Sequence, residues 1–230
     1  MPDNVKLLHI LNEEVIACRR CPRLVVYREK VAREKRRAFR DCAYWGKPVP
    51  GFGDANAQLL IVGLAPGAHG SNRTGRPFTG DKSGEFLYKA LYQAGFANQP
   101  TGSRPGDGLK LLNAYITAAA RCAPPDNKPL PSELLNCRAF LQREMIILKP
   151  RAVLALGKIG WDVYLGILRH EGVLVSRAAY PFAHGAEFDL PSGVRLFGVY
   201  HPSQQNTQTG RVTPAMYASV LRRIRRFLSQ

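Results

Sequence analysis

The sequence lacks the features that mark membrane-spanning and secreted proteins. No apolar run reaches the roughly 18 residues that a spanning helix requires. The N-terminus has no basic stretch followed by an apolar one. Internal repeats and low-complexity tracts are also missing, and the 45% hydrophobic residues are typical of a globular protein. We therefore expect a cytoplasmic protein that folds as one domain over residues 1–230, without contact to a membrane.

Acidic residues are scarce. The chain has 33 Lys and Arg against 17 Asp and Glu, which gives a formal net charge of +16. Such an excess favours a polyanionic partner, because phosphate contacts release counterions. We prefer nucleic acid to an anionic membrane surface, since no segment combines a basic run with a strong apolar face. Part of the excess lies in residues 23–40, which predict a solvated basic helix or arm within an N-terminal helical segment of about 1–45.

Several nucleotide-binding and hydrolase signatures are absent. The chain has neither G-x-G-x-x-G nor G-x-S-x-G. The segment 75–83 resembles a phosphate-binding P-loop, but Asp81 separates Gly80 from Lys82. A P-loop needs adjacent Gly and Lys so that backbone N–H groups and the ammonium converge on one phosphate. We therefore reject a nucleoside triphosphatase.

Cysteine is also infrequent, with five in the chain. In a cytoplasmic protein they argue against a disulfide framework. Cys18 and Cys21 form a C-x2-C pair, and Cys122 and Cys137 supply a second pair. Four thiolates can hold Zn²⁺ or a cubane iron–sulfur cluster, and the spacing does not choose between them. The alternative is a set of buried, reduced cysteines.

Apolar strands alternate with helical segments along the rest of the chain. Strands are predicted at 58–63, 114–121, 151–156, 174–179 and 194–200. Helices are predicted from 81 or 83 to 94, from a Ser132 cap to 148, from 157 to 170 and from Pro214 onward. This alternation predicts an α/β sandwich with a mainly parallel sheet.

Two strand ends carry unusual loops. Gly63 to Gly67 follow one apolar run, and His201 follows another, with a neutral loop rich in amides after it. Carboxyl ends of parallel strands meet at one edge of a sheet, where clefts form. A single His after a strand is more often a structural hydrogen bonder, but the amide-rich loop suits a polar ligand or a DNA groove.

Three segments, 63–67, 72–81 and 201–213, resemble the motifs of family 5 uracil-DNA glycosylases (the UDGb type). The four paired cysteines are similar in position to the [4Fe-4S] ligands of families 4 and 5. The resemblance implies a three-layer α/β/α sandwich around a central sheet of four parallel strands. It also implies a monofunctional DNA-repair enzyme that flips uracil out of DNA, cuts its N-glycosidic bond and leaves an abasic site. The cluster would be structural.

The same resemblance suggests roles for individual residues. His201 and Asp81 would be catalytic, with Asp81 as a plain helix cap the alternative. The flipped base would contact Gly63, Leu64, Ala65, Pro66, Gly67, Phe78 and Asn206. DNA would contact Arg73, Gln204, Gln205, Gly210, Arg211 and Val212, the last three as a wedge into the duplex. The partner would be double- or single-stranded DNA with a damaged base, bound by a monomer associated with the nucleoid.

One departure from the family pattern concerns specificity. Family 4 enzymes read uracil with an Asn where this chain has Ala118. A pocket without paired polar readers rejects analogues weakly, so we expect hypoxanthine or ethenocytosine to be accepted as well. The alternatives are a strictly uracil-specific family 4-like enzyme, a covalently trapping relative, and a non-catalytic nucleic-acid-binding module with structural zinc. The sequence assigns no role to His69, His184 or Cys42.

Overall fold

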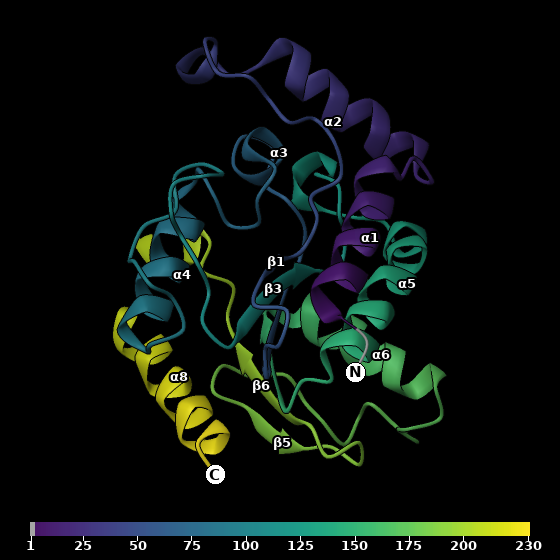
Figure 1. Ribbon diagram of the computed structural model, residues 1–230, viewed down its shortest axis with the longest axis vertical. Helices are drawn as coiled ribbons and strands as arrows, with labels where there is room; N and C mark the ends of the chain where they lie inside the picture. Colours follow the sequence, from purple (N-terminus) through teal and green to yellow (C-terminus); the bar gives the residue numbers. More distant parts are fainter. Residues whose placement is uncertain (1–2) are drawn as a thin grey trace.

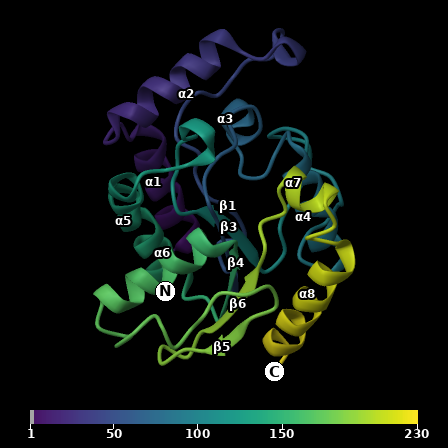
Figure 2. The same cartoon turned by 180° about the vertical axis from the view of Figure 1, so that it is seen from behind.

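The architecture is a mixed β-sheet between two layers of helices, in a computed structural model that describes residues 3–230 (Figures 1 and 2). The four central strands are β2 (Leu59–Gly63), β3 (Ala114–Ala118), β4 (Ala152–Leu156) and β6 (Arg195–Val199). They are parallel, in the order β3-β2-β4-β6. Their nearly continuous apolar sequences suit strands that are covered on both faces. The predicted α/β class is confirmed.

The expected strand count was too low, because the sheet has six strands among the described residues. Two short antiparallel strands flank the parallel core: β1 (Phe52–Gly53) beside β3, and β5 (Glu187–Asp189) beside β6. With two and three residues, these strands are too short to show an alternating pattern. The predicted strand at 174–179 was wrong, since those residues are turn and bend. Val175 there is 97% exposed and cannot join a core.

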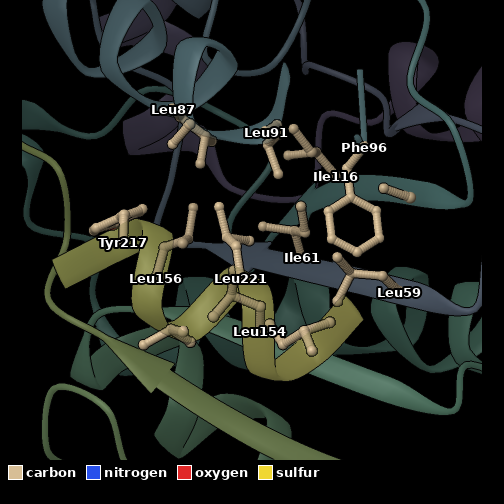
Figure 3. Close-up of a cluster of buried hydrophobic side chains, with 14 of the residues drawn as sticks. Leu59, Ile61, Leu87, Leu91, Phe96, Ile116, Leu154, Leu156, Tyr217 and Leu221 are labelled. Atoms are coloured by element: carbon tan, nitrogen blue, oxygen red, sulfur yellow. The ribbon is translucent and has the colours of Figure 1, made fainter. Parts of the chain in front are cut away.

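One face of the sheet is covered by α4 (Lys82–Gln93) and α8 (Pro214–Leu228). Figure 3 shows how Leu87 and Leu91 of α4 and Leu221 of α8 meet side chains of the central strands, including Ile61 and Leu154. All five side chains are fully buried. Burial of one such leucine or isoleucine contributes about 2 kcal/mol.

The opposite face is covered by α1 (Asn4–Ala17), α5 (Pro131–Leu148) and α6 (Lys158–His170). Trp161 of α6 is fully buried there, and its indole N–H donates to the Tyr180 carbonyl at 2.9 Å. The Ser132 cap of α5 was wrong: the helix begins at Pro131 and is capped at Leu130, whose N–H donates to the Glu133 carboxylate at 2.7 Å. Proline at the first helical position needs no N–H partner.

The basic segment 23–40 is divided into two pieces. Helix α2 (Pro22–Glu34) ends at Lys35, whose φ of 55° lies outside the helical region. A 3-10 turn, η1 (Arg37–Phe39), follows. Both views place α2 and the short α3 (Ser71–Thr74) at the end of the molecule opposite the C-terminus of α8 (Figures 1 and 2). Within residues 3–230, no helix combines the length and apolar character needed to cross a bilayer.

Candidate active site

The site lies where β2 and β6 end, at the carboxyl edge of the parallel sheet. Gly63 is the last residue of β2, and His201 comes two residues after the end of β6. β4 lies between these two strands and ends at Leu156. Since the three strands are parallel and in register, the loops that follow them emerge on the same side.

An aromatic contact joins the loops. The Phe78 ring lies with its centroid 5.8 Å from that of His201, at an interplanar angle of 32°. Phe78 also covers Gly63: a Cβ at residue 63 would lie 3.0 Å from the Phe78 ring. Phe78 has a φ of 49°, unusual for a bulky residue and typical of functional loops held by their surroundings. The fold thus brings His201, Phe78 and Gly63 together, although they come from three segments of the sequence.

His201 is neutral at physiological pH. Burial lowers its pKa to about 4, because a charged imidazolium loses its hydration there. The Asn206 side-chain amide donates to the His201 backbone carbonyl at 2.8 Å, so Asn206 braces the loop. Asn206 sits in α7 (Gln204–Gln208), a short helix capped by the Ser203 hydroxyl, which the sequence had suggested as an irregular loop.

Two side chains that sequence analysis left without a role fix the residue before His201. The Tyr200 N–H donates to His184 Nδ1 at 3.2 Å, and the Tyr217 hydroxyl donates to the Tyr200 carbonyl at 2.7 Å. Tyr217 is fully buried in α8. Both backbone groups of Tyr200 are therefore bonded to side chains, which limits rotation of the peptide that carries His201. No sequence motif connects these residues, so only the fold identifies them.

Asp81 caps a helix and also faces the glycine loop. Its Oδ1 accepts the Gly84 N–H at 2.9 Å, which is the N-cap geometry of α4. Its Oδ2 points at the loop after β2: a Cβ would lie 3.2 Å from it at Gly67 and 2.0 Å from it at Gly70. Burial raises the pKa of Asp81, against the opposing effect of the backbone N–H groups of Gly84 and Ser83. The Asp81 carboxylate thus caps α4 with Oδ1 and faces Gly67 and Gly70 with Oδ2.

His201 follows β6, and the Asp81 carboxylate faces the loop that follows β2. Among the described residues, no hydrogen bond or ion pair joins them. Phe78 connects them, since it contacts His201 and precedes Asp81 by three residues.

The loop after β2 continues the sheet for two residues. The Ala119 and Ala120 N–H groups donate to the carbonyls of Gly63 and Leu64, both at 2.9 Å. Leu64 and Ala65 are half-buried, and Pro66 is buried. Ala118 pairs with Gly63 in the register of β2 and β3 and is half-buried, so its methyl group lies at the same sheet edge.

The predicted DNA contacts differ in their surroundings. Gln204, Gln205, Gly210 and Arg211 are exposed, with the Arg211 guanidinium 4.8 Å from the Tyr200 ring centroid. Val212, in contrast, is 2% exposed and belongs to the core beneath α8. In this arrangement the Val212 side chain does not reach the surface, whereas Gly210 and Arg211 do.

Arg73 is engaged by its own loop. Its Nε donates to the His69 carbonyl at 2.8 Å, and its Nη2 donates to the Gly80 carbonyl at 2.9 Å. Its guanidinium also stacks 4.1 Å from the Phe39 ring centroid. These contacts make Arg73 a brace of the loop that leads to Asp81.

The four paired cysteines lie near one another, where α1, α2 and α5 meet the chain after β3. Cys21 and Cys122 share an apolar cluster with Leu24. Burial raises the pKa of the Cys122 thiol to about 12, and the nearby Cys137 and Cys18 act in the same direction. Within residues 3–230, no three His, Cys, Asp or Glu side chains form a preorganised metal cage.

The surroundings of these sulfurs nevertheless suit thiolates. The buried Arg28 donates from Nη1 to Cys122 Sγ at 2.9 Å, and the Asn136 amide donates to Cys21 Sγ at 3.4 Å. Arg28 leaves its Nε without a partner in the described structure. The Glu29 carboxylate lies 3.9 Å from Arg28 Nη2 and is half exposed, and metal-bound thiolates would supply a second negative counterpart on the buried Nη1 side. The donor set therefore fits a thiolate-bound metal or cluster.

Together, fold and site define an α/β protein with a neutral histidine and an aromatic platform at the carboxyl edge of its sheet. The family model described as the uracil DNA glycosylase superfamily matches residues 50–225. The chain is 52% identical to the type-5 uracil-DNA glycosylase of Thermus thermophilus over 215 residues, which are 93% of this chain and 95% of that protein. It is 46% identical to the type-5 enzyme of Pyrobaculum aerophilum over 209 residues, 91% of this chain and 88% of that protein.

A more distant relative is the type-4 uracil-DNA glycosylase of Archaeoglobus fulgidus, 27% identical over 159 residues, which cover 67% of this chain and 70% of that protein. The chain belongs to the uracil DNA glycosylase superfamily. Its resemblance to family 5 is confirmed by the higher identity to type-5 relatives.

Proposed function

We propose that this protein is a monofunctional glycosylase that excises uracil from DNA and leaves an abasic site. The observation that carries the proposal is the neutral His201 beside Phe78 at the carboxyl edge of the sheet, in a chain of this superfamily. A base within the duplex is out of reach of such a site, so the nucleotide must first be extruded, at a cost of a few kcal/mol.

The geometry suggests how this chain's residues act on the flipped nucleotide. As the N-glycosidic bond breaks, its electron pair moves onto the base, water adds to the sugar carbon, and the proton that the water loses reaches the released base through solvent. His201 donates a hydrogen bond to the base carbonyl, where the negative charge collects. A preorganised neutral donor is sufficient, since full proton transfer is not required. Phe78 provides a face on which the base stacks.

Asp81 serves the sugar side of the same reaction. Its Oδ2 faces Gly67 and Gly70, away from the cap contact with Gly84. A carboxylate in this place stabilises positive charge on the sugar or orients the attacking water. The reaction needs the ionised form, so the raised pKa of Asp81 sets a lower pH limit to activity.

Substrate breadth follows from the methyl group at Ala118. No amide reads the base edge from β3 at this position, and Asn206 donates one of its two amide N–H groups to the His201 carbonyl, which leaves it at most a partial reader of the base. We infer that uracil in U·G mismatches is excised and that hypoxanthine and ethenocytosine are accepted too, because rejection needs unpaired polar groups in the pocket. We expect the protein to act as a monomer. Both double-stranded and single-stranded DNA that contains a damaged base would be substrates.

Cys18, Cys21, Cys122 and Cys137 would hold a [4Fe-4S] cluster, with zinc the alternative occupant. The cluster would connect chain segments that are distant in sequence and would take no part in bond cleavage. The N–H donors of Arg28 and Asn136 toward sulfur support this donor set. Absorbance near 400 nm and about four iron atoms per chain would support the cluster, whereas a colourless, zinc-containing protein would favour zinc.

Single-turnover cleavage of an oligonucleotide with one U·G pair tests the function. The wild-type protein should release uracil and leave an alkali-labile site. His201→Ala should lower the rate by about 10²–10³-fold, the usual effect of removing one preorganised donor. Binding of the oligonucleotide without base release would instead indicate the non-catalytic module, and release of uracil alone from a lesion panel would indicate a strictly specific enzyme.

A further inference from the structure

A basic arm, residues 35–42, lies on the loop that carries Asp81. The arm follows α2 and contains η1. Arg36, Arg37 and Arg40 are exposed, and none of them forms an ion pair among the described residues. Asp41 is the acidic residue within the arm. The arm is therefore a concentration of free positive charge on the surface.

Side-chain contacts attach the arm and the residues after it to the site loop. The Phe39 ring lies 4.1 Å from the Arg73 guanidinium, and the Tyr44 hydroxyl bonds His69 Nδ1 at 3.0 Å. Arg73 in turn bonds the Gly80 carbonyl at 2.9 Å, directly before Asp81.

Backbone hydrogen bonds continue this attachment. The Trp45 N–H donates to the Arg73 carbonyl at 2.9 Å, and the Gly46 N–H donates to the Asn72 carbonyl at 3.0 Å. The chain after the arm thus runs along α3, and both views show the two segments at the same end of the molecule (Figures 1 and 2). These contacts hold the arm close to the loop that carries Asp81.

We infer that this basic arm binds the phosphate backbone of the DNA beside the extruded nucleotide, with Arg37 and Arg40 as phosphate contacts. The inference rests on the proposed glycosylase function and adds a second DNA-binding surface to the loop after His201. Guanidinium groups bind phosphate in any sequence context, so the arm contributes affinity rather than base selection. Because the arm is attached through Arg73, the distance between the bound DNA phosphates and the site around Phe78 and His201 is set by the fold.

A matched pair of double variants tests the arm. Arg37→Gln/Arg40→Gln removes two charges from it. Arg222→Gln/Arg226→Gln removes two charges from exposed positions of α8, whose end contacts Arg151 at the amino-terminal edge of β4. Both variants have the same net charge, so non-specific electrostatics affects them alike. The probe is a duplex with one U·G pair, measured by fluorescence anisotropy over a series of salt concentrations and by single-turnover cleavage.

The arm variant should bind about tenfold more weakly near 150 mM salt, and the slope of log K against log salt should fall by about 2, about one for each lost contact. Cleavage at saturating protein should stay within about twofold of wild type. The α8 variant should change neither slope nor affinity by more than about twofold. Equal effects of the two variants, or an unchanged slope in the arm variant, would overturn the inference. A wild-type protein that binds but releases no base would refute the proposed function and leave the comparison of slopes intact.

Discussion

The protonation state of His201 yields the sharpest prediction about mechanism. With a pKa of about 4, the imidazole remains neutral from pH 8 down to about pH 5. If the neutral ring is the donor, the single-turnover rate should not depend on titration of His201 across this range. A protonated histidine acting as general acid would behave differently: the rate would fall about tenfold for each pH unit above its pKa.

The same burial has a cost for folding at low pH. An unfolded histidine titrates near 6.5, so protons bind the unfolded chain first as the pH falls. His201 therefore destabilises the folded state progressively between about pH 6.5 and pH 4, and has no such effect above that window. The difference between 6.5 and about 4 corresponds to about 3 kcal/mol. His201→Ala should lose this part of the acid sensitivity when unfolding by urea is followed at pH 7.5 and pH 4.5.

The assay is a pH profile of single-turnover uracil release by wild type, His201→Ala and Asp81→Asn. Wild type should be flat on the alkaline side and decline on the acidic side, as the Asp81 carboxylate becomes protonated. His201→Ala should be slower by a constant factor with the same acidic limb, whereas Asp81→Asn should lose that limb. A decline above pH 6 that disappears in His201→Ala would refute the assignment of a neutral donor.

Three further predictions concern the surroundings of the site. Tyr217→Phe removes the hydroxyl that bonds the Tyr200 carbonyl. It should lower kcat several-fold with little change in KM and lower the free energy of unfolding in urea by about 1 kcal/mol. A rise in KM as large as the fall in kcat would instead indicate a general packing defect. Gly70→Ala places a methyl group 2.0 Å from Asp81 Oδ2, and cleavage should fall at least tenfold while circular dichroism stays unchanged; near-normal cleavage would separate Asp81 from catalysis. If the proposed iron–sulfur cluster is present, its removal by ferricyanide and a chelator should lower the melting temperature by several degrees and leave the cleavage rate of the remaining folded protein within a few-fold. An immediate loss of cleavage in protein that is still folded would contradict a structural cluster.

Sequence patterns predicted the central architecture well. Continuous apolar runs such as Leu59–Val62 indicate strands that are buried on both faces, and the helices between them imply a parallel sheet. The same reasoning failed for β1 and β5, because two or three residues carry no periodic signal and their pairing depends on the neighbouring strand. The sequence also did not indicate that Val212, named with Gly210 and Arg211 as part of the wedge loop, has its side chain in the core.

The candidate site was predictable only in part. His201 stands out because it follows the end of a predicted strand, whereas the roles of Asp81 and Phe78 were implied only by the resemblance to family 5. The two side chains that bond the Tyr200 backbone, His184 and Tyr217, could not be predicted in this way. They lie in different segments and meet only after folding. Likewise, the sequence marks the basic arm as charged, but its attachment through Phe39 and Arg73 is a tertiary contact.

By itself, the sequence determined the α/β class, the excess of positive charge and the family, because these follow from composition, local periodicity and motifs that are contiguous in the chain. Tertiary structure decided the neutral state of His201, the second contact of Asp81 and the position of the basic arm. Each depends on burial or on contact between segments far apart in the chain. Desolvation and packing depend on which residues are close in the folded protein. The order of residues along the chain does not show this directly.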